Sequence, residues 1–118
     1  MTTPSAEKTL HLTTSGRRTR KPHVVEIWFV MNNDKVYLSH EGEETDWMKN
    51  IRKDRQVVLR IGGKNLVGEA HFLNESTDEL WRAKVALYEK YYGQASREII
   101  MDWFSQSTLL SIKVLTVN

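Results

Sequence analysis

Four cations lie within five residues of this chain, at Arg17, Arg18, Arg20 and Lys21. Residues 9–14 alternate and are β-prone, residues 24–30 are β-branched and aromatic, and Ser15-Gly16 between them is a turn signal. The cations are therefore predicted to sit at a hairpin tip, among several Ser and Thr hydroxyls. Guanidinium groups, hydroxyls and free loop N–H groups are the donors that a phosphate requires. The segment indicates an anion-binding hairpin or, alternatively, a charged turn that is only solvated.

The remaining titratable side chains do not form a recognisable catalytic set. The histidines are scattered, without the paired spacing of metal ligands, at His11, His23, His40 and His71. Glu43, Glu44 and Asp46 are more typical of a solvated face than of a catalytic pair. The chain has no cysteine, which excludes thiol catalysis, disulfides and a Cys-based zinc site. We therefore expect no metal centre.

Length and composition indicate one globular domain. The chain has 118 residues, of which 40% are hydrophobic and 27% charged, and a net charge of +2. A domain of this size buries a modest core, so dimerisation is expected to add stability. The weak net charge disfavours nucleic acid as the general partner. No apolar run approaches the roughly 18–20 residues that span a bilayer, and the polar N-terminus resembles no signal peptide, so a cytoplasmic protein is expected.

Hydrophobic periodicity predicts the order β-β-β-α-β-β-α-α-β. Residues 1–7 are predicted to be a loose polar leader, and 8–118 the domain itself. The predicted strands are 8–14, 23–31, 35–39, 56–61, 65–73 and 109–117, and the predicted helices are 46–53, 76–92 and 95–104. Ser76 and Glu79 form a capping-box pattern at the start of the second helix. Gly68, inside a strand pattern, predicts a bulge or a close approach by another group.

Six strands with hairpin connections indicate an antiparallel sheet, and the two helical excursions indicate the α+β class, mainly β. No β-α-β unit with a Gly-rich first turn is present, so a Rossmann nucleotide site is not supported. So many strands with so few core residues favour a small closed barrel with helices packed outside. Periodicity alone does not separate a barrel from a sandwich.

The ordered set of motifs resembles the deazaflavin-dependent nitroreductases, relatives of the pyridoxamine 5'-phosphate oxidase-like flavin-binding split barrels. The likeness spans residues 9–117. It begins with Thr13-Thr14-Ser15-Gly16-Arg17-Arg18-Thr19-Arg20-Lys21-Pro22 and a strand containing aromatics. It continues through Ser39, Gly42, Trp47-Met48-Lys49-Asn50 and a Val-rich strand, and includes the late helix around residues 80–88, which is followed by Tyr and Gly.

The resemblance implies a split-barrel homodimer that binds F420 or FMN near the subunit interface. Carried over position by position, it implies phosphate or cofactor-tail ligands at Arg17, Arg18 and Lys21. Thr13, Thr14 and Ser15 would lie along the cofactor ring, and Ser39 and His40 near the ring edge or the tail. Trp47 and Asn50 would organise the helix that closes over the cofactor. The expected cofactor-binding set is thus Thr13, Thr14, Ser15, Arg17, Arg18, Lys21, Ser39, His40, Trp47 and Asn50.

Two departures from the family's pattern bear on the cofactor. Arg20 stands where the family usually has Gly. Glu43, Glu44 and Asp46 occupy a link that often carries Lys and Pro in the family. These acids should weaken binding of the polyglutamate-tailed F420 through repulsion between like charges. FMN therefore remains a competitor, and the sequence does not choose between the two.

The function expected is hydride transfer between bound F420 or FMN and a small organic acceptor of the quinone or nitroaromatic type. The cofactor would carry the chemistry, and no acid–base dyad is required. A second hypothesis is a cofactor-binding protein without turnover, acting as a store or sensor. A third is a small nucleic-acid-binding barrel. The strand aromatics argue against it, because Trp28 and Phe29 are adjacent and so point to opposite faces of the strand. Trp28, Trp81 and Trp103 are interpreted as core or dimer contacts, and Tyr88, Tyr91 and Tyr92 as core or pocket wall.

Overall fold

Six antiparallel strands form a closed barrel in the order β1-β2-β3-β6-β5-β4, with β4 pairing back on β1. The computed structural model describes residues 6–32, 34–74 and 77–117. The strands are β1 (Thr9–Ser15), β2 (Pro22–Asn32), β3 (Lys35–Glu41), β4 (Gln56–Ile61), β5 (Lys64–Phe72) and β6 (Ser107–Val117). The helices are α1 (Asp46–Lys53), α2 (Asp78–Tyr92) and α3 (Arg97–Trp103). The predicted α+β barrel and its element order are confirmed.

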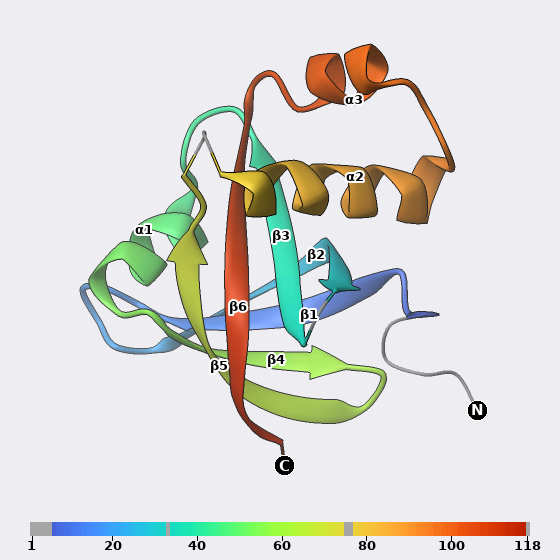
Figure 1. Ribbon diagram of the computed structural model, residues 1–118. Helices are drawn as coiled ribbons and strands as arrows, with labels where there is room; N and C mark the ends of the chain where they lie inside the picture. Colours follow the sequence, from blue (N-terminus) through green and yellow to red (C-terminus); the bar gives the residue numbers. More distant parts are fainter. Residues whose placement is uncertain (1–5, 33, 75–76, 118) are drawn as a thin grey trace.

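Two cores stabilise this arrangement. One lies inside the barrel, where alternate strand residues such as Leu12, Phe29 and Leu59 are fully buried, and α1 contributes Trp47, Met48 and Ile51 to it. The other lies outside, where α2 and α3 pack on the barrel through Leu80, Leu87, Ile100 and Phe104, among others. Figure 1 shows α1 beside the tip of the β1–β2 hairpin, and α2 crossing β3 and β6 with α3 beyond it. The two helical excursions therefore cover different parts of the barrel.

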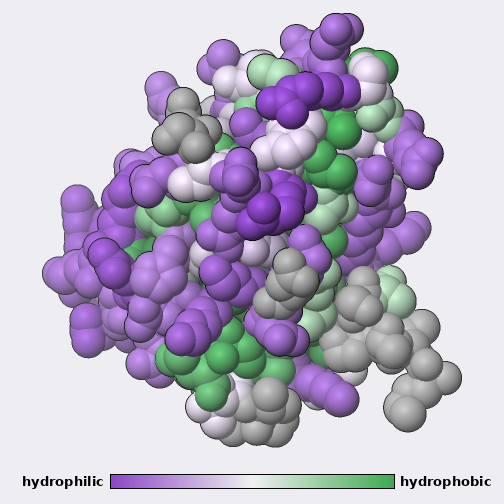
Figure 2. Space-filling model, in the orientation of Figure 1, coloured by the Kyte–Doolittle hydropathy of each residue, from purple (hydrophilic) through white to green (hydrophobic). Residues whose placement is uncertain are grey.

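The face that carries β6 is largely hydrophilic, and hydrophobic side chains gather at its lower end (Figure 2). Among the described residues, no helix is both long enough and apolar enough to span a bilayer.

Most predicted boundaries agree with the structure to within two residues, and the differences have long-range causes. β3 runs to Glu41 because Ser39–Glu41 pair with Ser107–Leu109 of β6, which also starts β6 two residues earlier than predicted. The N-cap of α2 is Thr77, whose hydroxyl accepts from the Leu80 N–H at 3.3 Å. Ser76 of the predicted capping box lies outside the described residues, as does most of the polar leader, residues 1–5. The carboxylate of Glu79 accepts hydrogen bonds from Lys35 and Tyr37 instead of a capping N–H.

Gly68 fulfils both parts of its prediction. The register between β5 and β6 shifts between Val67 and Gly68, which marks a bulge. A Cβ at this position would lie 2.5 Å from Ile112 Cγ2 and 3.0 Å from the Lys113 carbonyl oxygen. The glycine therefore allows β6 to approach β5 closely where the sheet bends.

The barrel wall opens between β2 and β3. These two strands pair only from Phe29 to Asn32 against Lys35 to Leu38. The first half of β2 pairs with β1 alone, and residues 39–41 of β3 pair with β6 alone. The strand edges that face each other across this seam therefore leave backbone N–H and C=O groups free of ladder bonds. This seam is the split in the barrel, and it positions the candidate site.

Candidate functional site

A groove follows the open seam from the hairpin tip to α2 and α3. It consists of three adjoining cavities of about 230, 460 and 340 Å³. The first and second share His23 and Asp46. The second and third share Glu26, Ile27, Ser39 and Glu41. We call them the basic end, the middle and the aromatic end.

The basic end is formed by the loop between β1 and β2. The Gly16 N–H donates to the Lys21 carbonyl and the Arg20 N–H to the Gly16 carbonyl, both at 2.8 Å. A Cβ at Gly16 would lie 3.0 Å from the Lys21 carbonyl oxygen, so the small residue permits this tight closure. Arg20 has a φ of +63°, in the left-handed region that favours glycine. This conformation gives a physical reason for the glycine that the related motif carries at this position.

A buried amide fixes the loop on α1. The Asn50 side-chain oxygen accepts from the backbone N–H of Arg17 at 3.1 Å and from its Nη1 at 3.0 Å, and the amide nitrogen donates to Thr14 Oγ1 at 3.1 Å. Arg17 Nη2 also lies 3.2 Å from Asp46 Oδ1, and Lys53 donates to the Arg17 carbonyl at 2.9 Å. Asn50 is 2% exposed, so its bond to Thr14 is buried and its bonds to Arg17 are partly buried, whereas the contacts of Asp46 and Lys53 with Arg17 are exposed. Arg17 and Asn50 therefore have a structural role in holding the loop.

The other cations of the loop are exposed. Within the described part of the chain, the side chains of Arg18, Arg20 and Lys21 make no hydrogen bond or ion pair, and Arg18 and Lys21 line the basic end with Arg17. Cationic donors left without partners around a cavity can meet an anion without breaking internal bonds.

The N-terminus of α1 faces the middle of the groove. Thr45 and Asp46 line this cavity together with Ser39, His40 and Trp47. The N-cap Thr45 makes no side-chain capping bond, and its Oγ1 is buried without a hydrogen-bond partner. The first N–H groups of a helix have no intrahelical acceptor. A buried hydroxyl and a helix N-terminus thus present unused hydrogen-bonding capacity to the groove.

The acids of the link before α1 are mostly compensated. Asp46 pairs with Arg17, and Glu44 forms a hydrogen-bonded ion pair with Arg52. Of the three acids in this link, Glu43 is the one whose carboxylate has no partner among the described residues, and it is exposed. The repulsion expected between these acids and an anionic ligand is therefore reduced to one solvated charge.

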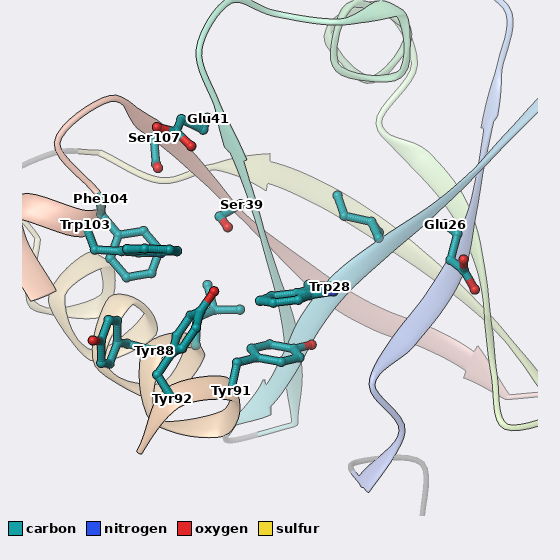
Figure 3. Close-up of a pocket in the computed structure, with 12 residues that line it drawn as sticks. Glu26, Trp28, Ser39, Glu41, Tyr88, Tyr91, Tyr92, Trp103, Phe104 and Ser107 are labelled. Carbon is teal, nitrogen blue, oxygen red and sulfur yellow. The ribbon is translucent and has the colours of Figure 1, made fainter. Parts of the chain in front are cut away.

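The aromatic end is enclosed by six aromatic side chains drawn from β2, α2 and the α3 region (Figure 3), namely Trp28, Tyr88, Tyr91, Tyr92, Trp103 and Phe104. Trp28 stacks on Tyr91 with ring centroids 4.0 Å apart, and Tyr92 lies edge-on to Trp103 at 4.9 Å. The only charged side chains that line this cavity, among the described residues, are Glu26 and Glu41. The aromatic end is thus apolar-walled and acidic, whereas the opposite end is basic.

Hydrogen bonds from the end of α2 hold the aromatic wall against β2. The Tyr91 hydroxyl contacts the Phe29 N–H and C=O, both at 2.8 Å, and the Lys8 carbonyl at 2.7 Å. Lys90 donates to the Phe29 carbonyl at 2.9 Å and lies 3.6 Å from the Phe29 ring centroid. Burial lowers the pKa of Lys90 to about 8, against a smaller opposing influence of Glu7. Burial also raises the pKa of the Tyr91 hydroxyl, so this group stays a hydrogen-bond donor at neutral pH.

The structure brings most of the predicted site residues to this groove, but not all of them. Arg17, Arg18, Lys21 and Asn50 line the basic end, and Ser39, His40 and Trp47 the middle. Thr13, Thr14 and Ser15 instead line a separate cavity of about 330 Å³ with Arg20 and Val58. Alternation along β1 further divides the three, because the buried Thr14 hydroxyl bonds to Asn50 while Thr13 and Ser15 are only half-buried.

Trp28 and Trp103 do not lie in the core, which was one of the two places expected for them. They are 47% and 51% exposed in this chain and line the aromatic end, and the alternative, a dimer contact, stays a prediction. The spacing of Tyr88, Tyr91 and Tyr92 on one side of a helix was the available signal. Among the described residues, no group of three His, Cys, Asp or Glu side chains could hold a metal ion.

Comparison with known proteins adds a family and a fold. A family model described as F420H(2)-dependent quinone reductase matches residues 2–101. No curated protein matches the chain. Among solved structures, a conserved hypothetical protein, Rv2991, from Mycobacterium tuberculosis superposes with a TM-score of 0.80 at 19% identity, covering 96% of this chain and 76% of that one.

Two further structures are informative. The heme storage protein HutZ from Vibrio cholerae gives a TM-score of 0.71 at 18% identity, over 92% of this chain and 82% of that one. A protein described as an F420 reductase gives 0.66 at 14% identity, over 93% and 88%. At these identities the likeness concerns the fold.

Proposed function

The chain belongs to the F420H(2)-dependent quinone reductase family, and from this we propose that it reduces a small quinone or nitroaromatic acceptor with F420 bound in the groove. The observation that carries the proposal is the joining of a basic loop to an aromatic cavity along the open seam. Such a groove can accept an anionic tail at one end and a planar acceptor at the other, with a ring system between them.

The residues present fit an anionic cofactor. Arg18 and Lys21 offer cations without internal partners, and Arg17 retains N–H donors beyond those bonded to Asn50 and Asp46. Thr45 offers a buried hydroxyl without a partner, at the N-terminus of a helix that favours negative charge. Because Glu44 and Asp46 are paired with arginines, the like-charge argument against F420 loses most of its force. FMN, which also carries a phosphate, is the competing cofactor.

When bound in its reduced form, the cofactor supplies a hydride, and a proton from solvent completes the two-electron reduction of a quinone to a hydroquinone. The loop at 16–21 would hold the phosphate. Ser39, which lines both the middle and the aromatic end, would offer its hydroxyl where ring and acceptor meet. His40 and Trp47 would border the ring in the middle. The aromatic walls would orient the acceptor and exclude water.

We also propose that the protein is a homodimer. Val24, Thr13 and Val58 are neighbours across β2, β1 and β4 on the outer face, and the two valines are 56% and 36% exposed. An exposed apolar patch beside polar residues is typical of an interface. In a dimer through this face, Thr13 and Ser15 would lie at the contact. If the cofactor binds near the subunit interface, as the resemblance implies, these two residues would then lie close to it. A molar mass that halves in Val24→Asp would support this interface, and a wild-type monomer would contradict it.

A cofactor-binding protein without turnover is the second candidate. It is favoured by one observation, that the same fold occurs in a heme storage protein. Steady-state reduction of menadione or a nitroaromatic by reduced F420 separates the two, because a store binds the cofactor and shows no turnover.

Fluorescence titration with F420 and, separately, with FMN tests the proposal. The test variant is Arg18→Ala/Lys21→Ala, which leaves the loop-holding Arg17 intact. We expect the affinity for F420 to fall at least about tenfold, since hydrogen bonds between charged groups contribute roughly 1.5–3 kcal/mol each. The matched control, Lys64→Ala/Lys113→Ala, removes two exposed cations of β5 and β6 and should bind normally. Equal affinity of both variants, or no binding of either cofactor by the wild type, would overturn the proposal.

A further inference from the structure

The two ends of the groove carry opposite charge. The basic end is lined by Arg17, Arg18 and Lys21, together with Asp46, which is paired with Arg17. The aromatic end has Glu26 and Glu41 as its only charged lining residues among those described, and both also line the middle. We propose that the aromatic end recognises an organic cation carried on a planar or aromatic group. As a statement about the electron acceptor, this rests on the proposed function. As a statement about binding, it concerns the cavity alone.

The geometry of the rings suits a cation. Trp28 and Tyr91 stack with 16° between their planes, which makes one flat wall. Tyr92 and Trp103 meet at 62°, and Tyr88 and Trp103 at 81°, so the rings surround the cavity from different directions (Figure 3). The faces of aromatic rings carry partial negative charge and attract ammonium groups, and several rings around one space are how proteins bind quaternary ammonium ligands.

These rings remain uncovered in the isolated chain. Trp28, Tyr92 and Trp103 are 47%, 49% and 51% exposed, although each belongs to the most hydrophobic part of the groove. Apolar area of this size, gathered around one cavity of about 340 Å³, indicates a place where a ligand is bound.

Two carboxylates, those of Glu26 and Glu41, give the cavity a negative charge that would attract a cationic ligand and would not favour a neutral one. Glu26 lies two residues before Trp28 on the same face of β2, where it accepts a hydrogen bond from Thr9 at 3.0 Å and lies 3.9 Å from His11 Nε2. Glu41 makes no side-chain bond to any described residue. Figure 3 shows the two carboxylates on different sides of Trp28. Glu26 lies apart from the rings, with its carboxylate turned toward Thr9 and His11, so it would attract a cation in the cavity over a longer range, while Glu41 is the lining carboxylate without an internal partner among the described residues.

The ammonium group of Lys90 does not cancel the attraction of a cationic ligand to this cavity. Lys90, on the same helix as the tyrosines, directs its ammonium to the Phe29 carbonyl and ring, and it does not line the cavity. An anionic acceptor would meet two carboxylates with no compensating cation in the lining, so the cavity should reject it. A neutral quinone would gain only ring stacking.

Three phenols of nearly equal shape test the proposal on the full chain without cofactor. They are 4-(trimethylammonio)phenol, 4-tert-butylphenol and 4-phenolsulfonate, with binding measured by calorimetry. We expect the cation to bind about tenfold more tightly than the neutral phenol, and the anion most weakly. In Glu26→Gln/Glu41→Gln the preference for the cation should fall several-fold while the affinity for the neutral phenol is unchanged. The matched control is Glu89→Gln/Glu98→Gln, which makes the same change in net charge on α2 and α3 outside the lining.

Equal affinity for the cation and the neutral phenol would overturn the inference, as would an unchanged preference in Glu26→Gln/Glu41→Gln. An equal fall in the control would also overturn it, because the effect would then be one of net charge. Its failure is distinguishable from failure of the proposed function. A protein that uses F420 to reduce neutral and cationic quinones equally well keeps the function and loses the inference. A protein that prefers the cationic phenol but binds no cofactor does the reverse.

Discussion

At the basic end of the groove, the loop depends on polar bonds to one buried side chain, Asn50, and its remaining cations are free. At the aromatic end, the walls depend on ring packing and on hydrogen bonds of the Tyr91 hydroxyl to the backbone. The first region needs only two elements, the tip of the β1–β2 hairpin and the short helix α1, although the bonds of Asn50 join residues that lie 33 and 36 positions apart. The second combines β2, β3, α2 and α3, which the chain brings together from distant positions. The difference teaches that charge can be positioned by one buried residue, whereas an apolar cavity requires the whole fold.

Asn50→Ala should break the basic end with the largest effect. It leaves the Arg17 N–H and the Thr14 hydroxyl without a partner in a buried place, and each such group costs about 1–3 kcal/mol. We expect the free energy of unfolding in urea to fall by about 3 kcal/mol. Cofactor affinity should fall as well, while the phenol affinities at the aromatic end stay within twofold. Asn65→Ala is the control, because that side chain accepts only a long 3.4 Å bond from Arg60.

Tyr91→Phe is the corresponding change at the aromatic end. The ring remains to stack on Trp28, but the Phe29 N–H loses its acceptor and the Lys8 and Phe29 carbonyls lose the one O–H donor that they share. The Phe29 carbonyl keeps its bond from Lys90. We expect thermal and urea unfolding to show a loss of about 2 kcal/mol, with the affinity for 4-tert-butylphenol nearly unchanged. Tyr92→Phe removes a hydroxyl with no bond to a described residue, and its stability should match that of the wild type. A large loss of phenol affinity in Tyr91→Phe would mean that the hydroxyl, and not the ring, contacts the ligand.

Raising the salt concentration should lower the affinity for F420 about tenfold and leave the affinity for the neutral phenol unchanged. Exposed charges such as Arg18 and Lys21 are screened within roughly 10 Å at 0.1 M salt, so raising NaCl from about 0.05 to 0.5 M should weaken F420 binding by that factor. Binding of the neutral phenol should not weaken, because ring packing carries it. Titrations of both ligands across the same salt series measure the contrast. Arg18→Ala/Lys21→Ala should show a flatter dependence for F420, and an equally steep one would place the anion elsewhere.

The basic end could be predicted from the sequence in larger part than the aromatic end. The hairpin cations are adjacent in the chain, and α1 begins and ends where its pattern predicted, at Asp46 and Lys53. The bonds between them were not visible, because they depend on how α1 docks against β1. Thr13 and Thr14 were grouped by resemblance, yet strand alternation directs them to opposite faces.

The aromatic end could not be assembled from the sequence. Which side of α2 faces the groove is set by the packing of Leu80, Leu87 and Phe104 against the barrel, and not by the tyrosines themselves. Trp103 joins them only because the chain reverses between α2 and α3, at Gly93 with a φ of +84°. The seam that joins the two ends is likewise a long-range feature, since it exists where β2 stops pairing with β3 at Phe29.

The smallest expected effect concerns two strained residues, and it sharpens the comparison because only one of them lies at the basic end. Arg20 and Asp34 have φ values of +63° and +65°, a conformation that costs a side chain about 1–2 kcal/mol relative to glycine. Glycine also gives more freedom to the unfolded chain, so Arg20→Gly and Asp34→Gly should each stabilise the fold by at most about 1 kcal/mol in urea unfolding. Both variants should behave alike in stability and differ in binding. Arg20→Gly removes a cation of the same loop, one that lines the separate cavity and not the basic end. It should therefore weaken F420 binding only about twofold, whereas Asp34→Gly should leave it unchanged. An Arg20→Gly protein that gains stability but binds F420 as the wild type does would show that Arg20 is strained and that its charge takes no part in binding, leaving Arg17, Arg18 and Lys21 as the cations of the anion site.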